Sequence, residues 1–136
     1  MRAVGPRIVV DGNNVMGATP DGWWRDRPGA VRRLLARVQC LQQRTGAEVV
    51  LVLDVPQPDL PEGEIGGVTV RYARRRGRDA ADDRIVELLD DHPAGGPAGD
   101  VEVVTSDRSL ADQAVRRGAT VIGARTFLAR LDGSGC

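Results

Sequence analysis

Aspartates stand where predicted strands end, and this pattern gives the sequence its clearest chemical signal. Asp11, Asp54 and Asp107 each follow a short, mostly apolar run. A further acidic group, Asp79, Asp82 and Asp83, begins a predicted helix after a basic loop. Because ligands of open α/β sheets bind outside the carboxyl ends of the strands, these side chains are expected to share one site.

Carboxylates gathered in one pocket raise each other's pKa unless a cation joins them. Aspartate oxygens, an asparagine carbonyl and water suit Mg²⁺ or Mn²⁺. His92 is the only histidine, which disfavours a zinc site and a Ser-His-Asp triad. The sequence therefore predicts a Mg²⁺ or Mn²⁺ site for phosphate chemistry, with one-metal and two-metal arrangements both open.

The elements that must position these acids alternate along the chain. Strands are predicted over 7–10, 48–53, 68–72, 101–105 and 119–122, and helices over 28–45, 79–91, 108–117 and 126–131. Most of the strands are uniformly apolar, which indicates a parallel sheet covered on both faces. The predicted fold class is α/β: a three-layer α/β/α, Rossmann-like domain with a mainly parallel five-stranded sheet. A strand order of 3-2-1-4-5 would place Asp11 opposite Asp107.

Length and composition limit the classes of protein. The chain of 136 residues predicts a single domain over 1–131 and a frayed tail over 132–136. No apolar run reaches the ~20 residues of a membrane span. The 19 acidic residues balance 19 basic residues, so the formal net charge is zero. All the basic residues are arginine, and codon bias explains this absence of lysine as well as phosphate binding does. Cys40, on a predicted helix, and Cys136, the last residue, suggest a reducing cytoplasm and no structural disulfide.

Three motifs resemble those of NYN-domain, PIN-like ribonucleases. They are Val-Val-Asp-Gly-Asn-Asn-Val at 9–15, Ala-Asp-Asp-Arg-Ile-Val at 81–86 and Val-Thr-Ser-Asp at 104–107. They occur in the family's order, and the chain as a whole is most similar to small bacterial NYN proteins of the YacP-like type. The resemblance implies a PIN-like fold and Mg²⁺-dependent hydrolysis of RNA.

The resemblance also implies roles for individual residues. Asp11 and Asp107 would bind the metal directly or through water, and Asp82 and Asp83 would complete the acidic cluster. Asn14 would hold a metal-bound water or Asp11. Where relatives carry a further acid after the last motif, this chain has Ser109 and Ala111, and its next acid is Asp112.

Each acid also has a structural interpretation. Asp11 could form an Asx-turn and Asp107 could cap a helix. Adjacent helical residues point about 100° apart, so only one of Asp82 and Asp83 is expected to face a metal, and Asp82 lies nearer the apolar side.

Four further polar residues form a second tier of candidates. Asp79 is expected to cap the helix rather than bind metal. Asp54 is either a turn residue or an outer acid of the site, and Asp112 has the i, i+4 spacing for an ion pair with Arg108. Asn13 and Asn14 follow the first strand in tandem, which favours a use for their amides.

Aromatic and basic side chains predict the RNA-binding surface. One of Trp23 and Trp24 is expected to anchor its loop and the other to stack on a base. The basic candidates for phosphate contacts are Arg25, Arg74, Arg75, Arg76, Arg78 and Arg108. The expected partner is single-stranded or looped RNA, and association with the ribosome and homodimerisation are open.

The alternative functions belong to other classes. A non-catalytic RNA-binding NYN module would keep the fold without needing the full acidic set. A small Mg²⁺-dependent phosphatase of the haloacid type would need an aspartate where Asn13 stands, and a receiver domain would need a lysine, which the chain lacks. The leading hypothesis is a metal-dependent endoribonuclease.

Overall fold

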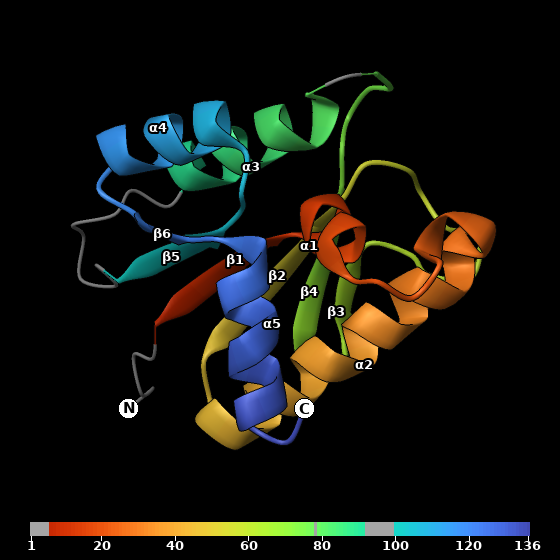
Figure 1. Cartoon of the computed structure of the whole chain (residues 1–136). Helices are drawn as coiled ribbons and strands as arrows, with labels where there is room; N and C mark the ends of the chain where they lie inside the picture. Colours follow the sequence, from red (N-terminus) through yellow and green to blue (C-terminus); the bar gives the residue numbers. More distant parts are fainter. Residues whose placement is uncertain (1–5, 78, 92–99) are drawn as a thin grey trace.

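A computed structural model describes residues 6–77, 79–91 and 100–136 (Figure 1). The strands in this part of the chain are β1 (Arg7–Asp11), β2 (Glu48–Leu53), β3 (Gly63–Ile65), β4 (Val68–Tyr72), β5 (Val101–Val104) and β6 (Thr120–Ile122). The helices are α1 (Gly12–Ala18), the 3-10 helix η1 (Trp23–Arg25), α2 (Arg27–Thr45), α3 (Ala80–Asp91), α4 (Arg108–Arg116) and α5 (Ala124–Gly133). Within these residues, no helix has both the length and the apolar character needed to cross a lipid bilayer.

One mixed sheet runs through the molecule in the order β3-β4-β2-β1-β5-β6. The five predicted strands are β4, β2, β1, β5 and β6, and they pair in parallel in the predicted order. The sixth strand, β3, was not predicted and pairs antiparallel with β4. It contributes only three residues, too few to show a period, although Gly66 and Gly67, both at positive φ, mark the hairpin turn.

Successive strand residues point to opposite faces of the sheet and pack into two separate hydrophobic cores, one on each face. Val10, Leu51 and Val70 pack under α1, α2 and α5. Val9 and Val52 belong to the other core, under α3 and α4. Figure 1 shows these two helical layers with the sheet between them, which confirms the three-layer α/β/α prediction.

Helix α1 was not predicted, because its sequence Gly-Asn-Asn-Val-Met-Gly-Ala is rich in poor helix formers. Tertiary packing holds it, since Val15 and Met16 are buried. At Gly12 a Cβ atom would lie 2.8 Å from Leu53 Cδ2 and 2.9 Å from the Val52 carbonyl oxygen. A side chain there would therefore push α1 away from the end of β2.

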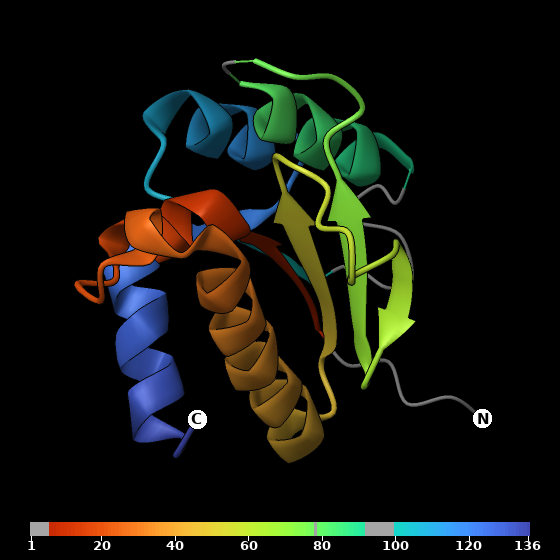
Figure 2. The same cartoon turned by 90° about the vertical axis from the view of Figure 1, so that its right-hand side faces the viewer.

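The carboxyl-terminal segment corrects two expectations. Helix α5 continues to Gly133, so the segment 132–136 is not frayed. Cys136 forms a disulfide with Cys40 of α2, contrary to the prediction of none, which removes the cysteine argument for a reducing compartment. The bonded residues are 96 apart in sequence, and only the packing of α5 beside α2 brings them together (Figure 2).

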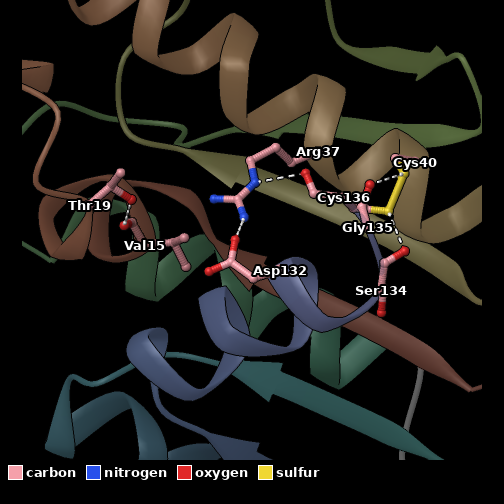
Figure 3. A network of polar contacts seen from close by, with 8 residues as sticks. All are labelled: Val15, Thr19, Arg37, Cys40, Asp132, Ser134, Gly135 and Cys136. Carbon is pink, nitrogen blue, oxygen red and sulfur yellow. Dashed lines mark hydrogen bonds and ion pairs between the residues drawn. A yellow bond between two sulfur atoms is a disulfide. The ribbon is translucent and has the colours of Figure 1, made fainter.

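Arg37 of α2 adds polar contacts to the same seam. Its Nη2 lies 2.5 Å from Asp132 Oδ1, and its Nε donates to the Cys136 carbonyl oxygen at 3.0 Å (Figure 3). The Cys136 amide in turn donates to the Leu131 carbonyl oxygen at 2.8 Å. The α2–α5 seam, meaning this disulfide together with the contacts of Arg37, therefore fixes the end of the chain.

Candidate metal centre

Three carboxylates converge at the edge of the sheet where the strands end. One oxygen from each of Asp79, Asp82 and Asp107 lies within 4.8 Å of the others. Asp79 precedes α3, Asp82 lies in its first turn, and Asp107 precedes α4. Asp82 and Asp107 are half-buried and Asp79 is exposed, so the group opens to solvent on one side. Three oxygens at this separation could hold a divalent cation.

Asp11, a predicted metal ligand at the end of β1, is not one of these three, but its buried carboxylate interacts electrostatically with Asp82 and Asp107. The residue is only 4% exposed, and its Oδ2 accepts a hydrogen bond of 2.9 Å from the Thr105 hydroxyl. Burial raises the pKa of Asp11 to about 6, and the negative charges of Asp107 and Asp54 add to the rise while the Thr105 hydrogen bond opposes it.

The acids of the site are coupled electrostatically. Burial raises the pKa of Asp82 to about 6, and the charges of Asp11 and Asp107 are the next causes. These side chains therefore repel one another in their ionised form. A bound cation would relieve that repulsion, so the donor set fits a hard divalent metal.

Thr105 connects the two predicted ligands that end neighbouring strands. Its hydroxyl donates to Asp11 and accepts a 3.1 Å hydrogen bond from the Asp107 amide. Asp107 also caps α4, because its Oδ1 accepts from the Leu110 amide at 2.9 Å. Capping and a place in the site therefore coexist. Thr105 was not singled out from the sequence, although it lies within the Thr-Ser-Asp motif and is fully buried.

The two asparagines brace the loops around the acids. Asn13 Oδ1 accepts from the Asp54 amide at 2.8 Å, and Asn14 Oδ1 accepts from the Ser106 amide at 2.7 Å. Asn14 thereby ties α1 to the loop that carries Asp107. Ser106, also missed from the sequence, accepts from the Ala124 amide at 2.9 Å and joins the start of α5 to the same loop.

The structure does not bring every candidate acid into the group. Asp83 is exposed and pairs with Arg75 at 2.5 Å, whereas Asp79, interpreted from the sequence as a cap, contributes an oxygen to the group. Asp79 adopts a positive φ of 63°, which places it in a sharp turn before α3. Asp112 is exposed on α4, and the ion pairs of the described residues include none between it and Arg108.

Acidic side chains on α3 neutralise part of the positive charge of the basic loop that precedes this helix. Arg74 pairs with Glu87 at 2.6 Å and Arg75 with Asp83. Arg76 is exposed, as is Arg108 next to Asp107, and Arg78 lies outside the described residues. The loop therefore presents less net positive charge beside the acids than its sequence suggests.

One of the two tryptophans anchors its loop against the core, as predicted, and the other is exposed. Trp23 packs against the core, and the Arg27 guanidinium lies 5.2 Å from the centre of its ring. Trp24 is 61% exposed, meets Trp23 edge to face with the ring centres 6.1 Å apart, and has Arg25 5.8 Å from its ring centre. Trp23 is the anchor, and Trp24 is free for an external contact.

Solved structures share this fold. The crystal structure of Rae1 (YacP) from Bacillus subtilis matches with a TM-score of 0.76 at 25% sequence identity, covering 94% of this chain and 74% of that one. A crystal structure of a point mutant of the same protein matches with a TM-score of 0.73 at 24% identity, covering 95% and 76% of the two chains. No curated protein sequence matches this chain.

The sequence itself carries the family assignment. The family model of the YacP-like NYN domain matches residues 8–134, a span that contains Asp11, Asp82 and Asp107. The family match suggests a nuclease-like function related to RNA, and the carboxylate group found here is compatible with such a function. With both sequence and fold in agreement, the chain belongs to the family of YacP-like NYN domains.

Proposed function

We propose that the protein is a metal-dependent ribonuclease that hydrolyses phosphodiester bonds of single-stranded or looped RNA. The convergence of Asp79, Asp82 and Asp107 beside the buried Asp11 is the observation that carries the proposal. Asp11, Asp82 and Asp107 would hold Mg²⁺ or Mn²⁺, with Asp79 completing the set. A cation held there would supply a bound water of lowered pKa and positive charge beside the scissile phosphate.

The chain's own residues hold these acids in place. The Thr105 hydroxyl stabilises the ionised form of Asp11, and the start of α4 fixes Asp107 through the Leu110 amide. Asn14 keeps the Asp107 loop against α1. Such preorganisation matters because metal ligands must keep their geometry while the phosphate changes shape.

Basic residues at the edge of the site suit a negatively charged substrate. Arg108 is exposed next to Asp107, and Arg76 is exposed in the loop before α3. Arg74 and Arg75 can exchange their carboxylate partners for phosphates, which arginine binds through two parallel hydrogen bonds. Each such contact would make RNA binding weaker as salt rises.

The decisive experiment measures cleavage of single-stranded and hairpin RNAs with Mg²⁺ or Mn²⁺. Replacement of Asp107 by Asn should lower the rate at least about 100-fold, because even groups that only orient metal ligands contribute 10- to 100-fold. Asp112→Asn, exposed on the same helix, is the matched control and should keep the wild-type rate.

Two other outcomes would change the conclusion. RNA binding without cleavage by the wild type would favour the non-catalytic RNA-binding module. Cleavage that survives both EDTA and Asp107→Asn would show that the carboxylate group is not the catalytic site. A further pair of variants tests which of the adjacent Asp82 and Asp83 belongs to the metal site. Asp83→Asn should reduce the cleavage rate far less than Asp82→Asn.

A further inference from the structure

A cavity of about 230 Å³ lies between α1, α2, α5 and the η1 segment, on the opposite face of the sheet from α3 and α4. Its lining includes Met16, Asp21, Trp23, Arg33, Leu34 and Leu128. No step of the proposed hydrolysis uses this space. Its walls combine an aromatic ring, aliphatic side chains and charged groups, which is the composition of a small ligand site.

The apolar walls suit a flat aromatic group. Met16, Leu34 and Leu128 supply aliphatic surface opposite the ring of Trp23. Stacking by Arg27 and the contact with Trp24 hold that ring in place without a ligand. A dry apolar cavity of roughly 150 Å³ is enough to bind benzene, so this one has room for a heteroaromatic base.

Charged groups on the same cavity could recognise the polar edge of a base. Arg33 pairs with Asp21 at 3.1 Å, and their side chains stay 51% and 33% exposed. Together they offer hydrogen-bond donors and an acceptor, which every nucleobase edge can use. Arg37, by contrast, is held by Asp132 and the Cys136 carbonyl oxygen and acts as a fixed wall (Figure 3).

Helix α1 connects this cavity to the carboxylates. It begins directly after Asp11, and its later residue Met16 lines the cavity, as does Thr19 just beyond it. Seven helical residues span on the order of 10 Å, a distance that a few nucleotides of single-stranded RNA can cover. Asn14 lies between the two ends and braces the Asp107 loop.

We propose that this cavity is a subsite that binds one unstacked nucleobase of the RNA and so positions a nearby phosphate at the carboxylates. The inference rests on the proposed ribonuclease function and adds to it how the substrate is held. Trp23 stacks on the base, Arg33 and Asp21 contact its edge, and the exposed Trp24 and Arg25 contact the adjoining nucleotide.

The test uses a single-stranded RNA of about a dozen nucleotides, intact or with one base removed at each position in turn. Binding is measured with Mg²⁺ in the Asp107→Asn background, in which cleavage should be at least about 100-fold slower. Loss of the bound base should weaken affinity about 5- to 140-fold at one position, as expected for one aromatic–base stack. The modified RNAs leave the fold of the protein untouched.

Protein variants locate the effect. Arg33→Ala and Trp23→Ala should weaken binding of the intact RNA and lose the sensitivity to the missing base, while Trp23→Phe should recover part of it. Arg32→Ala is the matched control, because Arg32 is the neighbouring arginine, carries an exposed ion pair with Asp59 and does not line the cavity. It should bind intact and modified RNAs as the parent does.

The failures of the two proposals are distinguishable. If the wild type cleaves RNA but every abasic RNA binds as tightly as the intact one, the subsite is wrong and the ribonuclease stands. Sensitivity to a missing base that persists in both Arg33→Ala and Trp23→Ala would place the base elsewhere and also overturn the subsite. A protein that neither binds nor cleaves any of the RNAs would overturn both.

Discussion

The carboxyl ends of the strands and the α2–α5 seam carry opposite electrostatic arrangements. Where the strands end, Asp11, Asp79, Asp82 and Asp107 gather like charges, and the pKa values of Asp11 and Asp82 rise. On the α2–α5 seam, opposite charges meet and a disulfide closes the contact. The first arrangement costs stability unless a ligand compensates for it, whereas the second adds stability, so function and stability reside in different parts of this small domain.

The largest expected effect on stability comes from the seam. Cys40→Ser should lower the free energy of unfolding by about 2–5 kcal/mol, because the disulfide closes a long loop in the unfolded chain. Chemical denaturation with and without reductant measures it. The wild type should fall to the variant's stability on reduction, and the variant should not respond. A wild type with a confirmed disulfide and no response to reduction would show that the seam does not stabilise the fold.

Metal binding should reverse the cost of the carboxylate group. Mg²⁺ or Mn²⁺ at 100 times its dissociation constant should stabilise the folded state by about 2.7 kcal/mol, because the site exists only when the chain is folded. Thermal unfolding at increasing metal concentration measures this. Asp82→Asn should abolish the shift while Asp112→Asn keeps it. An equal shift in both variants would place the metal elsewhere.

Without metal, stability should fall as pH rises through the raised pKa values. The folded state keeps protons on Asp11 and Asp82 up to about pH 6, whereas the unfolded chain releases them near 3.8. The folded state thus binds more protons than the unfolded chain in this interval. The contribution of these two carboxyl groups to the free energy of unfolding is therefore fully present below about pH 4 and is lost by about pH 7. The loss is about 1–3 kcal/mol, mostly from buried Asp11, because solvent screens half-buried Asp82.

Chemical denaturation in EDTA across this pH range measures whether the free energy of unfolding falls as pH rises. In Asp11→Asn this decrease should be smaller, because the amide does not titrate. A metal-free wild type that gains stability over the same interval would contradict the electrostatic difference between the two regions.

The smallest expected effect is a difference in stability between variants of two arginines in α2. Arg37→Ala should cost about 1 kcal/mol, because it leaves the Cys136 carbonyl oxygen and Asp132 without their partner. Arg32→Ala removes an exposed ion pair with Asp59 and should cost less than about 0.5 kcal/mol. Equal stabilities of the two variants would show that Arg37 is not part of the stabilising seam.

Local sequence patterns were sufficient for most of the fold. The ranges 48–53 and 68–72 agree with β2 and β4, because apolar runs of strand length between turn signals need no distant information. The predicted helix over 28–45 agrees with α2 to within one residue, and the structure shows Asp26 capping its start and Gly46 following its end. Helix α1 and strand β3 escaped prediction because tertiary contacts, rather than propensity or periodicity, hold them in place.

The sequence by itself determined that aspartates would gather at the carboxyl ends of parallel strands, because strand order and hydrophobic pattern leave few other arrangements. Only the tertiary structure decided which acids meet. The turn at Asp79 directs its carboxylate to Asp82 and Asp107, while the salt bridge to Arg75 occupies Asp83. It also decided the Cys40–Cys136 bond, because two thiols 96 residues apart become neighbours only when α5 packs beside α2.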